Sequence, residues 1–150
     1  MSSRGDNSTR PRPLATAYSG FYWEGARNGQ LLIQRCADCM RYLHPPGPIC
    51  PRCGSSPLQI VEVSGRATLH SFTTIRHLFH PAFRDDLPYI VARVELEEQA
   101  GLFLVTNLRR CAPEAARTGM PLRIIFERVG LDVLPQFVPA NVAESSVGAP

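Results

Sequence analysis

Residues 36–53 read CADCMRYLHPPGPICPRC and contain two Cys-x-x-Cys pairs, Cys36/Cys39 and Cys50/Cys53, with ten residues between the pairs. Zinc takes four ligands at tetrahedral angles with Zn–S distances of about 2.3 Å. A Cys-x-x-Cys turn lets two thiolates converge on one ion while backbone amides support the sulfurs. Two such turns form a closed site without a position for water or substrate, so we expect a structural rather than a catalytic metal.

The cysteine quartet has other interpretations: two disulfides, four unrelated thiols, or an iron site of rubredoxin type. Disulfides need an oxidising compartment, which nothing in the polar N-terminus supports, and two such pairs so close together are improbable by chance. Iron uses the same ligand set as zinc, so spacing alone does not distinguish the two metals. His44, in the proline-rich linker, is expected to be solvated, and Cys111 is expected to be a plain thiol.

The composition is that of one folded, mostly β protein. Of 150 residues, 44% are hydrophobic and 19% charged, which permits an ordinary core. Fourteen prolines and eleven glycines favour short strands and turns over a helical bundle. The net charge of +3 is too small to indicate a dedicated nucleic-acid-binding protein. The chain has no apolar run of roughly 18 residues and no apolar signal-peptide core near its start, so we expect a cytoplasmic protein.

The order of the chain predicts four segments. We expect a disordered leader over 1–13, a helix and zinc ribbon over 14–58, a β-barrel over 59–140 and a flexible tail over 141–150. The helix is expected over 16–28, ending at Gly29. β-branched and aromatic residues between turn signals predict strands over 31–35, 59–63, 66–75, 89–96, 102–107, 122–129 and 131–138. Five or six short strands of this kind are typical of an OB-type barrel.

Two connections in the barrel are irregular. Residues 76–88, RHLFHPAFRDDLP, form a connection that is long for a hairpin, and such loops more often carry function than merely connect. Residues 109–120 are expected to contain one helical turn, at the position where OB-type barrels commonly place a helix.

Several motifs occur in an order that resembles a known family. After the aromatic helix come Leu-x-x-Gln-Arg-Cys36-x-x-Cys39, a Pro-Pro stretch, Cys50-Pro-x-Cys53-Gly-Ser and the Ser64-Gly-Arg-Ala-Thr strand opening. This order resembles the DUF35 family, whose members carry a rubredoxin-like zinc ribbon before an OB-fold. The likeness covers residues 21–139, and it is most specific for the ribbon and for the start of the barrel.

The resemblance implies an accessory role beside an enzyme of acyl-CoA metabolism. Members of the family accompany thiolase-like proteins, including aldolases of the lipid-transfer-protein type that cleave steroid side chains. It therefore implies that this chain binds such a partner and helps to hold its CoA-thioester substrate, while the catalytic groups belong to the partner. The residues agree on one point: Asp85-Asp86 is more typical of a solvated pair than of an acid/base dyad, so we expect no catalytic residues in this chain.

The loop 76–88 offers the chemistry that CoA requires. Arginine forks suit its phosphates, a flat side chain suits its adenine, and an apolar channel suits its pantetheine arm. The candidate CoA-binding or partner-binding residues are Arg76, His77, Phe79, Phe83 and Arg84. An alternative is that Phe79 and Phe83 only plug the open end of the barrel. Of the helix aromatics, Trp23 is expected to be the exposed residue that contacts a partner.

A zinc ribbon beside an OB barrel is also a nucleic-acid-binding combination, because OB surfaces stack single-stranded bases on aromatic side chains in a positive groove. The small net charge and the acidic residues Glu95, Glu97 and Glu98 argue against this alternative. A steep loss of affinity for single-stranded DNA with rising salt concentration would favour it.

Overall fold

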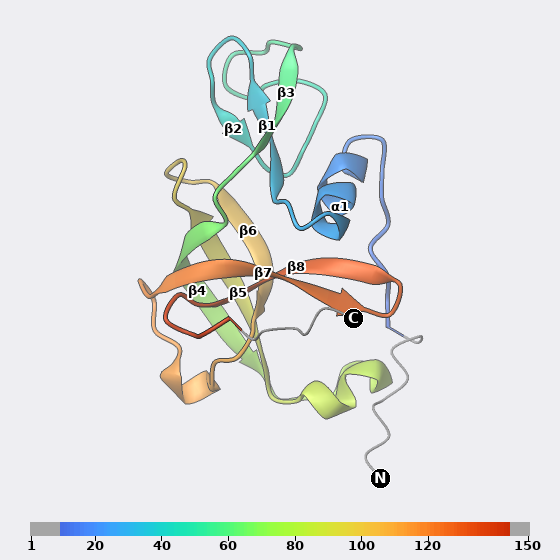
Figure 1. Ribbon diagram of the computed structural model, residues 1–150, viewed down its shortest axis with the longest axis vertical. Helices are drawn as coiled ribbons and strands as arrows, with labels where there is room; N and C mark the ends of the chain where they lie inside the picture. The colour runs from blue at the N-terminus through green and yellow to red at the C-terminus, as the bar shows by residue number, and fades with distance from the viewer. Residues whose placement is uncertain (1–9, 145–150) are drawn as a thin grey trace.

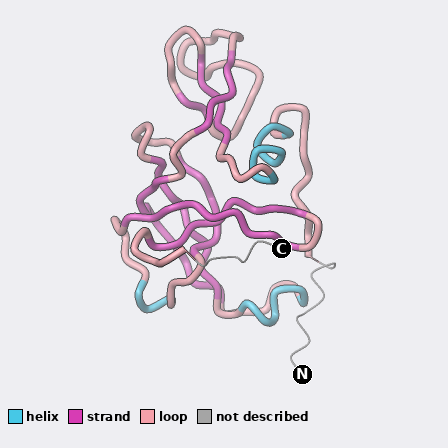
Figure 2. Tube along the Cα trace, viewed as in Figure 1, coloured by secondary structure: helices cyan, strands magenta, loops and turns pink. Residues whose placement is uncertain are grey.

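The computed structural model describes residues 10–144, which form a helix, a three-stranded sheet and a five-stranded barrel (Figure 1). The helix is α1 (Gly20–Arg27), and the small sheet contains β1 (Leu32–Cys36), β2 (Tyr42–Leu43) and β3 (Leu58–Glu62). The barrel contains β4 (Arg66–Ile75), β5 (Tyr89–Leu96), β6 (Phe103–Leu108), β7 (Pro121–Val129) and β8 (Asp132–Pro139). Two short 3-10 helices, η2 (Pro81–Asp86) and η3 (Pro113–Ala115), lie in its loops. Strands thus dominate the fold (Figure 2).

The barrel closes in the strand order β4-β5-β6-β8-β7. Its strands alternate: in β5 every second residue from Ile90 to Leu96 is buried, as the two-residue period of a strand requires. The inward residues Leu69, Val94 and Phe137 are completely buried. The mainly β fold with an OB-type barrel is therefore confirmed, and the helical turn predicted within 109–120 is η3.

The small sheet is the ribbon, and it includes a strand that the sequence places in the barrel. β1 is central and pairs antiparallel with β2 on one edge and with β3 on the other. The strand predicted over 59–63 is therefore a ribbon strand, not a barrel strand. β3 pairs with β1 from Leu32 opposite Glu62 to Cys36 opposite Leu58, and Gly65, with a φ of +75°, turns the chain from β3 toward β4. The domain boundary between 58 and 59 remains a prediction, and β3 spans it.

The ribbon and the barrel share a hydrophobic core. Leu31 and Ile33 at β1 and Val63 after β3 join the same buried cluster as the barrel residues. Polar contacts add to this packing at the turn between β5 and β6. The side chain of Gln99 accepts from the Tyr42 amide at 2.9 Å and donates to the Tyr42 carbonyl at 3.2 Å, and the Glu98 carboxylate accepts from the Ser64 amide at 2.7 Å. These contacts fix the ribbon on the barrel.

We expect Gln99→Ala to loosen the ribbon on the barrel. The change removes two hydrogen bonds and leaves the Tyr42 amide and carbonyl without their partner, which costs about 1–3 kcal/mol. Urea unfolding should show this loss, and the Tyr42 amide should exchange its hydrogen faster. Gln59→Ala is the matched control, because Gln59 is an exposed glutamine in β3 of the same ribbon. Equal effects of the two substitutions would contradict the assigned role of Gln99.

Helix α1 is shorter than predicted and packs on β8 and β1. Residues 16–19 form a turn instead of a helix, because the Thr16 and Ser19 hydroxyls accept hydrogen bonds from each other's backbone amides. The helix then begins at Gly20, and the chain reverses at Gly29 with a φ of +73°, as expected. Tyr22 packs against the shared core. The helix therefore depends on tertiary packing for its place.

Residues 10–13, the end of the expected leader, lie against the barrel, while residues 1–9 lie outside the described residues (Figure 1). Arg10 forms an ion pair of 2.7 Å with Asp86 in η2. Arg12 binds both carboxylate oxygens of Asp132 at the start of β8, at 2.7 and 3.0 Å. Ion pairs thus attach this segment at two points. Of the expected tail, residues 145–150 lie outside the described part of the chain, and the Val142 carbonyl accepts from Arg123 at 2.6 Å.

The attachment through Asp132 is expected to depend on pH. The Arg12 hydrogen bond and charge lower the pKa of Asp132 below its ordinary value. A carboxylate with a lowered pKa in the folded state contributes stability above its unfolded pKa and loses it as the pH falls through its folded pKa. We therefore expect residues 10–13 to stay attached at neutral pH and to detach below about pH 4. A titration followed by NMR of the Arg12 Nε–H would show this, and Asp132→Asn should appear detached at every pH.

No helix in the described part of the chain has the length and apolar character that crossing a membrane requires.

Candidate functional site

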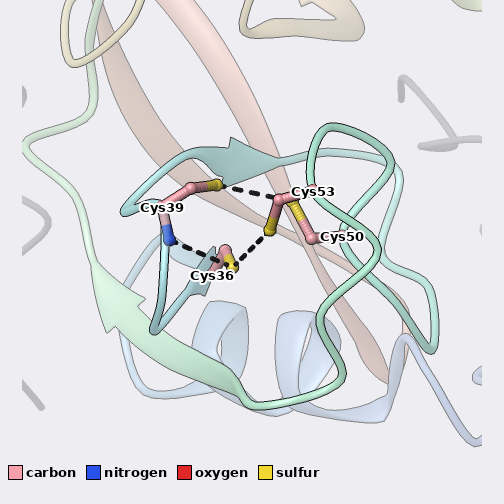
Figure 3. A group of neighbouring side chains, drawn as sticks. All are labelled: Cys36, Cys39, Cys50 and Cys53. Atoms are coloured by element: carbon pink, nitrogen blue, oxygen red, sulfur yellow. Dashed lines mark hydrogen bonds between the residues drawn. The ribbon is translucent and has the colours of Figure 1, made fainter.

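The four cysteines of the ribbon meet at one point (Figure 3). Their Sγ atoms all lie within 4.8 Å of one another, and the Cys36–Cys53 and Cys39–Cys50 sulfurs are each 3.6 Å apart. A tetrahedron with metal–sulfur bonds of about 2.3 Å has edges of about 3.8 Å. A disulfide would need sulfurs about 2 Å apart, and all four cysteines are free thiols. The residues therefore fit a tetrahedral metal ion.

Two similar turns bring the sulfurs together. In the first turn the Met40 amide donates to the Cys36 carbonyl, and the Cys39 amide approaches the Cys36 Sγ at 3.5 Å. In the second, the Gly54 amide donates to the Cys50 carbonyl at 2.8 Å, and Gly54 takes a φ of +77°. Each turn thus reverses the chain directly after its second cysteine. Amides that point at sulfur also stabilise the thiolate form, which is the form that binds a metal.

The thiols differ in acidity. Hydrogen bonds from the Ser55 side chain and backbone lower the pKa of Cys53 to about 6, and the backbone amide of Cys53 lowers the pKa of Cys50. At Cys39 the Arg41 amide lowers the pKa, but desolvation and the neighbouring thiols together raise it to about 11. Cys53 is therefore the group that is ready as a thiolate at neutral pH, whereas ionisation of Cys39 needs a cation beside it.

The site has four protein ligands and is partly buried. Cys36 and Cys50 are buried with Leu43, and Leu58 packs against them. Four protein sulfurs complete a tetrahedral site, so its metal would be structural. His44 is not part of the cluster. The expectation that His44 is solvated is wrong: its ring lies 5.5 Å from that of Tyr22, and burial lowers its pKa.

The structure separates the candidate residues of the loop 76–88 into two groups. Arg76, His77, Phe79 and Arg84 are exposed. Phe79 is 77% exposed, and its ring meets the His77 ring edge-on at 4.9 Å. Phe83 instead packs on Tyr89 and lies under the Arg10 guanidinium at 5.0 Å. The loop thus presents its arginines and Phe79 to the outside, while Phe83 fixes η2 on the barrel.

The acidic pair of this loop does not form a dyad. Asp86 is bound by Arg10, and its neighbour Asp85 is exposed. Beside Phe83 lies a small cavity of about 70 Å³, lined in part by Asn107, Arg109 and Gln136. Sequence reasoning missed these residues because Asn107 and Arg109 lie at and just after the end of β6, whereas Gln136 lies in β8. The cavity is too small for a CoA molecule, since ligand pockets usually hold at least about 300 Å³.

Trp23 and Cys111 are both half-buried. Trp23 is half-buried: its ring meets Tyr22 edge-on at 5.0 Å, and it borders a small hollow with Arg27 and Val133. Its role at a partner interface stays a prediction. Cys111 is also half-buried, and burial raises the pKa of its thiol. A raised pKa leaves less thiolate and makes Cys111 a poor nucleophile.

Two domain families match the chain. Residues 23–59 match the family described as "ChsH2, rubredoxin-like zinc ribbon domain", and residues 60–127 match "ChsH2, C-terminal OB-fold domain". The two matches meet between 59 and 60, within β3.

Three curated relatives are similar over much of the chain. A probable enoyl-CoA hydratase alpha subunit of Thermomonospora curvata is 43% identical over 91% of this chain. The 3-oxo-4,17-pregnadiene-20-carboxyl-CoA hydratase alpha subunit of Mycobacterium tuberculosis is 35% identical over 81%. This chain spans only 42% and 37% of the lengths of these two proteins. A DUF35 domain-containing scaffold protein of Methanothermobacter thermautotrophicus is 31% identical, over 63% of this chain and 70% of the relative.

A solved structure agrees with these relatives. A chain in the structure described as "Ltp2-ChsH2(DUF35) aldolase" is 42% identical, with a TM-score of 0.78 over 86% of this chain and 99% of that chain. The ribbon with its four clustered cysteines, the closed five-stranded barrel and these similarities all agree. The chain belongs to the DUF35 family, with a rubredoxin-like zinc ribbon followed by an OB-fold.

Proposed function

We propose that this chain is a non-catalytic accessory subunit that holds structural zinc and pairs with a thiolase-superfamily enzyme of the lipid-transfer-protein type. In this role it helps to hold a CoA-thioester substrate for retro-aldol cleavage, as in steroid side-chain degradation. The observation that carries the proposal is the match to the DUF35 chain of an aldolase, which this chain covers almost completely. The relatives named as hydratase alpha subunits support a CoA-linked substrate.

The geometry supports a structural role for the metal. The proposed ligands are Cys36, Cys39, Cys50 and Cys53, and zinc is preferred to iron because the ribbon domain family is a zinc ribbon. When bound, the ion supplies four metal–sulfur bonds that hold the two turns together. The protein contributes the amides and the Ser55 hydroxyl that stabilise the thiolates.

The exposed part of the loop 76–88 is the proposed contact with the CoA moiety of the substrate. Arg76 and Arg84 supply charges for phosphates, and the exposed ring of Phe79 supplies a stacking surface. Among the described residues, Arg76 pairs only with Glu114, in an exposed ion pair of 3.4 Å that costs little to exchange for a phosphate.

Co-expression with an Ltp2-type aldolase tests the proposal. We expect a complex that survives size-exclusion chromatography and cleaves its CoA-thioester substrate, while this chain alone cleaves none. Turnover by the purified chain alone would contradict the non-catalytic role, and failure to copurify would contradict the pairing. Binding of single-stranded DNA with a steep salt dependence would instead favour a nucleic-acid-binding module.

The loop has its own test in that complex. We expect Arg76→Ala/Arg84→Ala to raise KM for the CoA thioester about tenfold, because two charge-assisted contacts to phosphate are lost. Arg52→Ala is the matched control, since Arg52 is an exposed arginine in the ribbon. An unchanged KM in the loop variant would show that the CoA moiety of the substrate binds elsewhere.

A further inference from the structure

An open groove of about 720 Å³ runs along β7, on residues that the proposed function does not use. Six successive residues of the strand, 123–128, border it. Successive side chains of a strand point to opposite faces. A hollow bordered by all six is consistent with a position at the edge of the strand. The remaining lining residues are Arg109, Arg110 and Glu144.

This edge of β7 is free over half its length. β4 pairs with β7 only through Arg66–Thr68, opposite 121–123, and the Ile124 amide donates to the Gly65 carbonyl at 2.9 Å. Beyond Ile124, no described residue pairs with β7 on the side away from β8. Backbone groups of alternate residues point to the same edge, so the N–H and C=O groups of Phe126 and Arg128 point where that of Ile124 points. Within residues 10–144, residues 125–129 thus offer an unpaired edge about 16 Å long.

The groove carries an excess of positive charge. It is lined by four arginines and two glutamates. Arg109 is paired with Glu127 at 3.1 Å, and Arg123 donates to the Val142 carbonyl. The side chains of Arg110 and Arg128 make no hydrogen bond or ion pair within residues 10–144. Arg110 also has a φ of +52°, which is unfavourable for a residue with a Cβ, so surrounding structure holds its backbone in this conformation.

The arginines of the groove favour some binding partners of the β7 edge over others. A second copy of this chain would bring its own arginines against these, and like charges disfavour that pairing. A small anion would meet the guanidinium groups but would leave the backbone groups of the edge unpaired. An extended acidic segment satisfies both features, with backbone hydrogen bonds to β7 and carboxylates beside the arginines.

We propose that the free edge of β7 binds an extended acidic segment of a protein partner as an additional β-strand, with Arg110 and Arg128 as the residues that select for negative charge. The inference rests on the proposed function only in that an accessory subunit has a protein partner. The site itself is independent of the loop 76–88 and of the identity of the enzyme.

Binding of a synthetic peptide to the full, metal-loaded chain tests this site. The probe is a fluorescein-labelled, acetylated and amidated hexapeptide, Val-Glu-Val-Glu-Val-Glu, followed by fluorescence anisotropy. Two further versions carry N-methyl groups on the three valines or on the three glutamates, so that one of them blocks the hydrogen bonds to β7. A Val-Lys repeat and inorganic pyrophosphate complete the set. Matched protein variants are Arg110→Gln/Arg128→Gln and the control Arg27→Gln/Arg52→Gln, which also removes two exposed charges.

We expect the acidic peptide to bind, and R110Q/R128Q to weaken it at least tenfold while the control pair changes it less than twofold. One N-methylated version should fail to bind, the lysine repeat should not bind, and the Phe126 and Arg128 amides should gain protection from hydrogen exchange. The proposal is wrong if the acidic peptide does not bind. It is also wrong if both N-methylated versions bind as well as the parent peptide, because backbone hydrogen bonds then do not contribute. If pyrophosphate displaces the peptide and the Phe126 and Arg128 amides stay unprotected, the groove is a site for small anions and the proposal is again wrong.

These outcomes are separable from those of the proposed function. If the peptide binds but no aldolase copurifies, the accessory role fails and the edge site stands. If the aldolase copurifies equally well with R110Q/R128Q and the peptide does not bind, the edge site fails and the accessory role stands.

Discussion

Cys50→Ser is expected to lose the metal and the folded ribbon together. Binding of zinc to a structural site contributes about 10–16 kcal/mol in zinc-finger peptides at neutral pH, which is comparable to the whole stability of a typical domain, about 5–15 kcal/mol. A serine hydroxyl does not replace a thiolate as a ligand, and the buried position of Cys50 leaves no room for a substitute donor from solvent. Metal analysis should fall from near one atom per chain to almost none.

The loss should extend into the barrel. Leu31, Ile33 and Val63 belong to the same core as the barrel residues, so an unfolded ribbon removes part of the barrel's packing. We expect a lower melting temperature, faster hydrogen exchange at Leu69 in β4 and a tendency to aggregate. Treatment of the unmodified chain with a chelator should reproduce these changes, and zinc should reverse them.

Cys111→Ser is the control for this variant. Cys111 is a half-buried thiol outside the cluster, so its replacement should leave the metal content unchanged and the stability nearly so. A Cys50→Ser chain that retains one metal per chain would refute the four-sulfur site, as would a Cys111→Ser chain that loses it.

The second large effect is expected for Gly65→Ala, at the turn between the ribbon and the barrel. Gly65 has a φ of +75°, and a Cβ added there would lie 2.3 Å from Cγ2 and 3.1 Å from Cβ of Ile124. Ile124 has little freedom to move away, because its amide donates to the Gly65 carbonyl and its side chain packs against the core. The backbone cost of about 1–2 kcal/mol and the overpacking cost of about 1–3 kcal/mol therefore add.

Gly101→Ala separates these two costs. Gly101 has a nearly equal φ of +80°, but nothing lies within 4 Å of an added Cβ. We expect it to lose only the backbone contribution, so urea unfolding should show a free-energy loss for Gly65→Ala that is at least 1 kcal/mol larger. Equal losses of unfolding free energy in the two variants would mean that the Ile124 side chain moves aside without an energetic cost. The contact between Gly65 and Ile124 would then not position the ribbon.

Much of the fold could be predicted from local patterns. The four cysteines lie within 18 residues, and the turns that shape their cluster need only the cysteines and the residues beside them, so spacing alone indicated the ribbon. β4 and β5 have the predicted bounds because Gly65 and Pro88 stop the preceding chain directly before them. The helix was predicted too long because the hydrogen bonds between Thr16 and Ser19 compete with helical ones.

The exposure of single aromatic and histidine side chains could not be predicted in the same way. Phe79 and Phe83 occur in one loop and look equivalent in sequence, yet one is exposed and the other packs on Tyr89 beneath Arg10. His44 lies in a proline-rich linker that suggests a surface turn, but the helix brings Tyr22 against it. Both outcomes depend on segments that are distant along the chain.

The sequence by itself indicated the cysteine cluster, most strand positions and the family, because each depends on residues within one turn, one strand or one short motif. Only the tertiary structure decided that β3 pairs with β1, that Gln99 holds Tyr42, and that Arg110 and Arg128 share a groove at a free strand edge. Strand pairing is a choice among partners of similar local pattern. That choice is made by the shared core and by the turn at Gly65, whose contacts join residues far apart in the chain.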